Sequence, residues 1–397
     1  MRPGWQNKTL GELCEIELGK TPARANASFW DEQRETGNVW LSIADLLKAE
    51  ENIVIDSKEY VSDKGAAICK LVPKGTLLVS FKLTLGRLAF AGRDLFTNEA
   101  IAALTIFNER ELSKEFLFYC LTFFDWVKAA ENDVKLKGMT LNKAKLKVMP
   151  VSFPPLTEQQ RIVAILDEAF DGIAKARANA EQNLQNARAL FESHLQSVFT
   201  QRGEGLMENR LGDVCAITST LVDPRKEDFI DLTHVGAGNI ESQTGVFVEL
   251  KTAREEGLIS GKFLFDESMV LYSKIRPYLM KVARPDFNGL CSADMYPLTP
   301  KPNEITRDYL FHLLLSKPFT DYAILGSARA GMPKVNREHL FEFRTWLPGV
   351  EKQRELSAQL DALHEETQRL ESIYQRKLAA LDDLKKSLLH QAFTGQL

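Results

Sequence analysis

Basic side chains gather in two stretches of the chain that contain no acidic residue. The first, from Lys135 to Lys147, holds five lysines, and the second, from Arg329 to Arg337, holds two arginines and one lysine. Lysine attracts phosphate groups, and arginine can also donate paired hydrogen bonds to the edge of a guanine. The stretches therefore predict contact with a nucleic acid. The alternative is that they are the solvated charges of ordinary loops.

A Gly-Met pair lies within each stretch, at Gly138 and at Gly331. Glycine permits tight turns and lets the backbone come close to another molecule. A third acid-free stretch, from Ser273 to Arg284, adds four cations, and its counterpart in the first half adds two. We predict that DNA is bound by residues of these stretches, namely Lys82, Arg87, Lys135, Lys137, Gly138, Lys143, Lys145, Lys274, Arg276, Lys281, Arg329, Gly331, Lys334 and Arg337.

The sequence contains none of the catalytic motifs that we searched for. There is no phosphate-binding loop ending in Gly-Lys-Ser/Thr, no His-Glu-x-x-His, and no Asn/Asp-Pro-Pro-aromatic motif of an amino-methyltransferase. Residues 235–239 hold two glycines of a dinucleotide-binding fingerprint, but they are better explained as a loop after a strand. The six histidines are scattered. We therefore predict no catalytic residue, no metal site and no cofactor bound by this chain.

The overall charge does not suit a DNA-binding protein that acts alone. The formal net charge is −4, whereas independent DNA-binding domains are usually basic. Binding would therefore rest on local basic patches or on partners that add positive charge. No apolar run is long enough to span a membrane, and the first residues lack a signal peptide. Five widely spaced cysteines without a Cys-x-x-Cys pair favour a reducing, cytoplasmic location.

The chain contains an internal repeat. Residues 10–16 (LGELCEI) recur as 211–217 (LGDVCAI), and Gly138-Met139 recurs as Gly331-Met332. Residues 155–161 (PLTEQQR) recur as 348–354 (PGVEKQR). The last two matches are both 193 residues apart (331 − 138 and 348 − 155). Because the matches keep their order along the whole chain, they indicate a duplicated pair of domains.

Each half combines a mixed region with a long helix. Apolar runs at 76–79 and 101–104 predict strands, and 116–121 lies in a helical stretch. We predict globular domains at 1–154 and 202–347, and long helices at 155–201 and 348–397. The expected class is α+β, with two tandem mixed α/β domains separated by two helices that pack as an antiparallel coiled coil, related by a pseudo-two-fold repeat.

The long helices are predicted from apolar residues that recur every three or four positions. In the first helix these residues are Ile162, Leu166, Ala169, Ile173, Ala176, Ala180, Leu184, Ala187, Phe191, Leu195 and Val198. In the second they are Leu356, Leu360, Leu363, Thr367, Leu370, Tyr374, Leu378, Leu381, Leu384 and Leu388. A helix of about 40 residues is roughly 60 Å long. The stripes favour pairing of the two helices, and packing of each on its own domain is the alternative.

The first helix is expected to begin at Thr157. Its hydroxyl would cap the helix, and Gln160 would stand at the matching capping-box position.

Several of these segments resemble one known family. Residues 155–167 (PLTEQQRIVAILD) resemble the start of the conserved helix in type I restriction specificity subunits. Residues 388–397 (LLHQAFTGQL) are similar to the usual C-terminus of that family. The segment from Trp5 to Ile16 and both Gly-Met stretches also fit its target recognition domains. The resemblance covers the whole chain.

The resemblance implies a non-catalytic DNA-recognition subunit that serves host defence. Each target recognition domain would recognise one half of a split site in double-stranded DNA, and spacer length would follow helix length. Two methyltransferase subunits would dock on the helices, and motor-nuclease subunits would complete the complex. S-adenosylmethionine, ATP and Mg are expected in those partners. Partner binding is expected at Glu158, Gln159, Arg161, Glu351, Gln353 and Arg354.

The second copy of the helix motif is altered. It has Gly349 and Lys352 where the first copy has Leu156 and Gln159, which leaves open whether both helices dock a partner equally well. Two rival functions also stay open: a restriction or methylation enzyme in a single chain, and a coiled-coil scaffold with no role on DNA.

Overall fold

The chain folds into two compact units in a computed structural model, which describes residues 4–131, 134–135, 138–201, 206–327 and 333–397. Unit 1 comprises Met1–Asn179 together with Lys377–Leu397, and unit 2 comprises Ala180–Arg376. Two helices of 45 residues, α7 (Leu156–Thr200) and α12 (Val350–Thr394), contribute one segment to each unit. The last residues of the chain therefore belong to unit 1, which a linear division into domains separates from them.

Unit 1 is built on a five-stranded sheet with the order β2-β9-β6-β7-β4. A three-stranded sheet, β5-β3-β8, and two antiparallel pairs, β1–β12 and β10–β11, accompany it. The strands are β1 (Gln6–Thr9), β2 (Cys14–Leu18), β3 (Val39–Leu41), β4 (Ile53–Val54), β5 (Glu59–Tyr60), β6 (Leu77–Ser80), β7 (Leu88–Ala91), β8 (Phe96–Thr97), β9 (Ile101–Ile106), β10 (Val134–Lys135), β11 (Gly138–Met139) and β12 (Pro150–Phe153).

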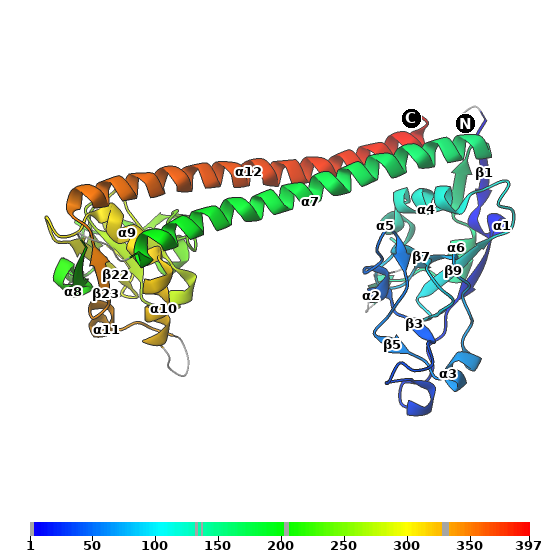
Figure 1. Cartoon of the computed structure of the whole chain (residues 1–397), viewed down its shortest axis with the longest axis horizontal. Coiled ribbons are helices and arrows are strands. Elements are labelled where there is room, and N and C mark those ends of the chain that lie inside the picture. The colour runs from blue at the N-terminus through cyan, green and yellow to red at the C-terminus, as the bar shows by residue number, and fades with distance from the viewer. Residues whose placement is uncertain (1–3, 132–133, 136–137, 202–205, 328–332) are drawn as a thin grey trace. The chain divides into compact units, whose positions relative to one another are not determined.

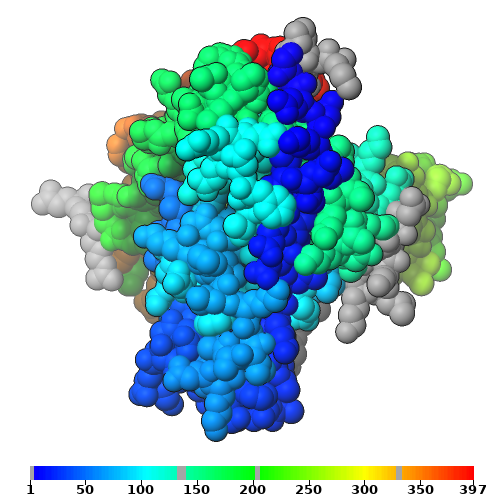
Figure 2. All heavy atoms as spheres, turned by 90° about the vertical axis from the view of Figure 1, so that its right-hand side faces the viewer, coloured from blue at the N-terminus to red at the C-terminus, as the bar shows by residue number. Residues whose placement is uncertain are grey.

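The helices of unit 1 divide between two regions. They are α1 (Leu10–Leu13), α2 (Ile43–Leu46), α3 (Asp63–Ile68), α4 (Lys114–Phe123), α5 (Trp126–Ala129) and α6 (Lys143–Lys147). The main core joins the sheet, α4 and the start of α7 through buried residues such as Leu77, Phe116 and Ile162. The segment with β3, β5 and α3 lies at the end of unit 1 farther from α7, where its residues are blue (Figures 1 and 2).

Unit 2 has a four-stranded sheet with the order β14-β22-β19-β20, a five-stranded sheet with the order β15-β18-β21-β16-β17, and the pair β13–β23. The strands are β13 (Met207–Arg210), β14 (Cys215–Ala216), β15 (Leu221–Val222), β16 (Thr233–Val235), β17 (Lys251–Thr252), β18 (Lys262–Phe265), β19 (Val270–Ser273), β20 (Val282–Ala283), β21 (Gly289–Cys291), β22 (Met295–Pro300) and β23 (Arg344–Leu347). The helices are α8 (Leu211–Val214), α9 (Arg307–Leu315), α10 (Lys317–Leu325) and α11 (Arg337–Phe341).

The duplication predicted from the sequence is confirmed by the order of the strands. The sequence β2-β9-β6-β7 in unit 1 corresponds to β14-β22-β19-β20 in unit 2. The strand that opens each unit pairs antiparallel with the strand before the long helix, β1 with β12 and β13 with β23. The glycine-containing segment at 235–239 follows β16 as a short 3₁₀ turn, as the sequence indicated.

The apolar stripe of α7 is buried or half-buried at every predicted position. In α12 the same holds except at Leu384, which is 46% exposed, while the neighbouring Lys385 places its ammonium 4.9 Å from the centre of the Phe170 ring. Side by side in each unit, the two helices run antiparallel (Figure 1). Arg177 pairs with Asp382 in unit 1, and Arg188 pairs with Glu371 in unit 2, so residue numbers fall on one helix as they rise on the other.

A buried glutamine ties the start of each long helix to its own unit. The Gln159 side chain donates to the carbonyls of Glu111 and Pro154, both at 2.8 Å, and accepts from the Ser113 amide at 2.9 Å. It has no exposed surface. Because α7 begins at Leu156, Thr157 lies inside the first turn, and the prediction that it caps the helix is wrong.

The same three hydrogen bonds recur in unit 2. Gln353 donates to the carbonyls of Glu304 and Pro348, both at 2.9 Å, and accepts from the Thr306 amide at 2.8 Å. Gln353 is also fully buried. A buried amide whose donors and acceptor are all satisfied strengthens an interface, whereas removal of its side chain leaves several buried backbone groups without partners.

We predict that Gln159→Ala destabilises unit 1 and Gln353→Ala destabilises unit 2, each by about 1–3 kcal/mol, because each change leaves buried backbone polar groups unsatisfied. Hydrogen exchange of the full chain measures this, with faster exchange expected in the unit that carries the change. Gln160→Ala is the matched control, because Gln160 is exposed one residue further along. Equal effects of Gln159→Ala and Gln160→Ala would contradict a tethering role.

Candidate nucleic-acid interface

In unit 2 the backbone brings two of the predicted basic stretches together. The loop after β19 lies against the segment before α11, where Ile275 and Lys334 form an isolated antiparallel bridge. The Val335 amide donates to the Lys274 carbonyl at 2.8 Å, and the Arg276 amide donates to the Pro333 carbonyl at 2.9 Å. Lys274, Arg276, Lys334 and Arg337, which we call the unit 2 cluster, therefore lie near one another.

The charges of the unit 2 cluster are only partly compensated. Asp294 lies 3.0 Å from the Lys334 ammonium and 3.8 Å from the Lys274 ammonium. Burial lowers the pKa of Lys274, the positive charges of Lys334 and Arg337 lower it further, and Asp294 opposes them. Arg276 and Arg337 are exposed, and their guanidinium groups have no carboxylate partner among the described residues. The cluster thus presents positive charge to solvent.

Unit 1 has an equivalent arrangement. Lys82, after β6, bridges to Thr140, and the Leu141 amide donates to the Phe81 carbonyl at 2.9 Å. Helix α6 follows at once, and it carries Lys143, Lys145 and the further lysine Lys147. Lys82, Lys143 and Lys145 form the unit 1 cluster. Burial raises the pKa of Glu99, but a hydrogen bond from Thr21 and the charges of Lys82 and Arg24 bring it below its usual value.

The remaining predicted DNA-binding residues fall into three groups. Lys281 is half-buried, and its ammonium donates to the Ala237 carbonyl at 2.6 Å, while Arg87 is exposed. Lys135 and Gly138 face each other across the β10–β11 hairpin. Lys137, Arg329 and Gly331 lie outside the described residues.

Arg284, which the sequence places among the basic residues of Ser273 to Arg284, has a structural role instead. It donates to Asp361 on α12 at 2.7 and 3.0 Å and to Asp308 at 2.8 Å. His312 Nε2 lies 2.9 Å from the same Asp361 carboxylate. In unit 1 the hydroxyl of Tyr119, on α4, donates to Asp167 on α7. Each long helix is therefore held by one aspartate to the helix beneath it.

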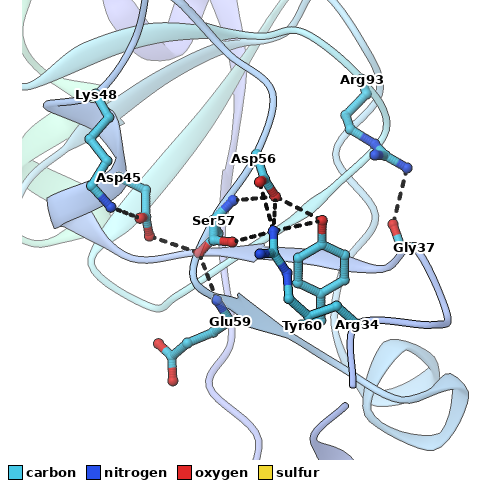
Figure 3. Close-up of polar contacts among 9 residues, drawn as sticks. All are labelled: Arg34, Gly37, Asp45, Lys48, Asp56, Ser57, Glu59, Tyr60 and Arg93. Atoms are coloured by element: carbon cyan, nitrogen blue, oxygen red, sulfur yellow. Dashed lines mark hydrogen bonds and ion pairs between the residues drawn. The ribbon is translucent and has the colours of Figure 1, made fainter. Parts of the chain in front are cut away.

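The far end of unit 1 holds arginines that are already paired, and Figure 3 shows them. The Arg34 guanidinium lies 2.6 Å from Asp56, 3.0 Å from the Ser57 carbonyl and 3.2 Å from the Tyr60 hydroxyl. Hydrogen bonds from Arg34 and Tyr60 lower the pKa of Asp56 to about 2. Arg93 donates to the Gly37 carbonyl at 3.1 Å. These contacts stabilise the loops around β5 and leave little free positive charge.

One hollow in this region was missed by sequence reasoning. It has a volume of about 310 Å³ and is open to solvent, and Arg24, Trp30 and Lys58 contribute to its lining. The Arg24 guanidinium lies 4.1 Å from the centre of the Trp30 ring and also pairs with Glu59. No motif in the sequence points to it, because its residues come from separate loops. Among the described residues, no group of histidines, cysteines and acids is placed to hold a metal ion.

At the helix starts, the structure corrects two predictions about partner binding. Gln159 and Gln353 are buried and fully hydrogen-bonded within their units, so these side chains are not available to a partner. The two helices are also equivalent at a separation of 194 residues (353 − 159), one more than the sequence match indicates. The additional residue enters ahead of α11, since the equivalent cap residues Asn142 and Asn336 are also 194 apart (336 − 142).

The corrected register changes which charges correspond. In α7, Glu158 pairs with Arg161 at 2.7 Å. The equivalent residues of α12 are Lys352 and Glu355, which also pair at 2.7 Å, so the order of charges is reversed. Glu351 and Arg354 pair with each other as well, and both are exposed. The four charged residues predicted for partner binding are thus accessible, but the two helix starts present different surfaces.

Comparison with known proteins places this architecture. Residues 3–182 and residues 203–377 each match the family described as Type I restriction modification DNA specificity domain. The chain belongs to this family. The two matches fall on the two halves of the repeat, so each half is one copy of the specificity domain. No helix within the described ranges has both the length and the apolar character needed to cross a membrane.

Two curated relatives are also similar to the chain. It is 36% identical to the EcoDI type I restriction enzyme specificity subunit of Escherichia coli over 188 residues, which are 47% of this chain and 41% of the relative. It is 24% identical to the MjaIX type I restriction enzyme specificity subunit of Methanocaldococcus jannaschii over 251 residues, which are 57% of this chain and 55% of the relative. The chain thus spans about half the length of these relatives.

Solved structures share the fold. One, reported in work on complex assembly and conformational transition of the type I R-M system, has a TM-score of 0.75 at 19% identity and covers 100% of this chain and 99% of that chain. The HsdS subunit from Thermoanaerobacter tengcongensis has a TM-score of 0.60 at 18% identity, with 100% and 98% covered.

We predict that mild acid destabilises unit 2 of this specificity-domain protein more than unit 1. Burial lowers the pKa of His234, His312 and His364, all in unit 2, whereas unit 1 has only the exposed His390. Groups whose pKa is lower in the folded state take up protons on unfolding. Stability contributed by their neutral forms is therefore lost as the pH falls below about 6.5.

Hydrogen exchange at pH 7 and at mildly acidic pH, corrected for the intrinsic rate, measures this difference. His312→Gln is the matched variant, because an amide can keep a hydrogen bond to Asp361 without titrating. It should weaken the pH dependence of unit 2. An equal loss of protection in both units would count against the prediction.

Proposed function

We propose that this chain is the sequence-recognition subunit of a type I restriction-modification complex, and that each unit recognises one half of a split site in double-stranded DNA. The observation that carries the proposal is the pair of equivalent basic clusters. The unit 1 cluster and the unit 2 cluster occupy the same place in the repeat, after β6 with α6 and after β19 with α11. Membership of the specificity-domain family, once for each half, supports it.

Phosphate contacts explain how an acidic chain can bind DNA. The net charge of −4 is unfavourable over long distances, but contacts between clustered cations and phosphates release counterions locally. Arg276, Lys334 and Arg337 are exposed in one patch and so can approach the phosphate backbone together. We infer that the isolated chain binds DNA weakly and that partner subunits supply further contacts.

The partners in this proposal are two methyltransferase subunits and motor-nuclease subunits. They would hold S-adenosylmethionine, ATP and Mg, and this chain would contribute no catalytic residue. The exposed pairs Glu158–Arg161 and Glu351–Arg354 offer charged surface at the helix starts for the methyltransferases. Because equivalent positions of the two helices carry reversed ion pairs, we propose that the two methyltransferases make different contacts there. The complex would act in the cytoplasm.

Neutralising the unit 2 cluster should weaken DNA binding at every sequence. For Arg337→Ala or Lys334→Ala, the slope of log K against log salt should fall by about 0.9, the value for one lost phosphate contact. Fluorescence anisotropy with a labelled duplex, repeated over a series of salt concentrations, measures the slope. Lys317→Ala is the control, since Lys317 is exposed on α10 and paired with Asp321. An unchanged slope for both cluster variants would contradict a phosphate contact.

Exchange of residues 1–154 for the corresponding part of another specificity subunit should change one half-site and leave the other intact. The reason is that the unit 1 cluster and the sheet that carries it lie within that segment, whereas unit 2 keeps its own cluster. Mapping of methylated adenines in cells that express the hybrid with its methyltransferase gives the new site. A change in both half-sites, or in neither, would show that the units do not recognise DNA separately.

A further inference from the structure

One hairpin loop in each unit keeps its backbone form while its side chains differ. In unit 1 the loop of residues 81–86 joins β6 to β7, and in unit 2 the loop of residues 274–280 joins β19 to β20. Both loops close in the same way. The Ser80 amide donates to the Arg87 carbonyl at 2.9 Å, and the Ser273 amide donates to the Lys281 carbonyl at 3.0 Å.

Left-handed backbone occurs at equivalent places in both loops. Leu83 has φ 63° and Gly86 has φ 72° in unit 1, while Arg276 has φ 50° and Met280 has φ 47° in unit 2. This conformation is unfavourable for residues with a side chain, and glycine avoids the cost. Strained positions of this kind tend to persist at functional sites. The presence of leucine and arginine where glycine would relieve strain indicates a use for their side chains.

The loops are held firmly enough to maintain the strain. In unit 1 the Ser80 hydroxyl donates to the Thr84 carbonyl at 2.5 Å, and Trp126 packs so closely on Gly86 that a Cβ there would meet its ring at 2.3 Å. In unit 2 Pro277 is buried, and the Gln243 amide donates to the Met280 carbonyl at 3.2 Å. Each loop therefore presents its remaining side chains from a fixed frame.

The side chains that remain exposed have different chemistry in the two units. Leu83 is 54% exposed, an unusual degree for a leucine beside a basic cluster. Tyr278 is 51% exposed, and Arg276 beside it is exposed without an acidic partner among the described residues. The neighbouring cations differ in this respect, since Lys274 and Lys334 lie close to Asp294 and Lys281 donates to a backbone carbonyl.

We propose that these two loops recognise bases, with Arg276 donating to a guanine in the half-site of unit 2 and Leu83 contacting a thymine methyl in the other half-site. The inference rests on the proposed DNA-recognition function and adds the side chains that discriminate. A guanidinium can bond both acceptors of a guanine edge, and an apolar side chain suits the thymine methyl. The shared frame explains how one fold can serve two different half-sites.

Selection from a library of random duplexes tests the proposal. The full chain, assembled with its methyltransferase partners, is incubated with the library, and the bound duplexes are sequenced. The unmodified chain should enrich a split motif. Arg276→Ala should lose discrimination at one G·C position of one half-site by about ten- to one-hundredfold, and Arg276→Lys should lose part of it, because lysine cannot form the paired contact. Leu83→Arg should alter only the other half-site.

Arg337→Ala is the matched control, since Arg337 is an exposed arginine of the same cluster on α11. It should reduce binding to all duplexes and keep the motif. Thermal unfolding of each variant checks that it is folded. A motif that stays unchanged in Arg276→Ala, or that is weakened uniformly as in Arg337→Ala, overturns the base contact while leaving the proposed function intact. Failure of the unmodified assembly to enrich any motif overturns both.

Discussion

A buried glutamine amide at the root of each long helix sets where that helix leaves its globular domain. Gln159 and Gln353 have no exposed surface, and each makes three hydrogen bonds to backbone groups of its own unit. A helix is stiff, so its first turn determines where every later side chain lies. Asp167 and Asp361, two turns further along, then meet Tyr119 and His312. The position of each helix on its domain depends on this root.

The duplicated frame carries different chemistry in its two copies. The tether on the helix aspartate is a tyrosine in unit 1 and a histidine with an arginine in unit 2. The first ion pair on each helix has opposite polarity, Glu158 with Arg161 and Lys352 with Glu355. Backbone hydrogen bonds and buried apolar contacts hold the frame, and these tolerate changes in exposed side chains. Divergence of recognition is therefore possible without loss of fold.

Charge alone is a poor guide to the interface, because many of the cations have structural partners. Arg34 is paired with Asp56, and Arg284 is paired with Asp361 and Asp308. Those guanidinium groups would have to give up strong hydrogen bonds before they could contact a phosphate. Arg276 and Arg337 give up no such bond. The distribution of carboxylates in space thus selects which of the basic residues can serve on DNA.

The sequence by itself determined the duplication, the two long helices and their apolar stripes, and the basic stretches. Each of these depends on a local pattern: order of motifs, a period of three to four residues, or a run of like charge. Tertiary structure decided that Gln159 is buried, that Thr157 lies inside the helix, that Leu384 leaves the stripe, and that the repeat shifts from 193 to 194 residues. It also joined Lys377–Leu397 to unit 1. These outcomes depend on contacts between residues far apart in the chain, such as Gln353 with Glu304, and no local pattern records whether a polar side chain will find such a partner.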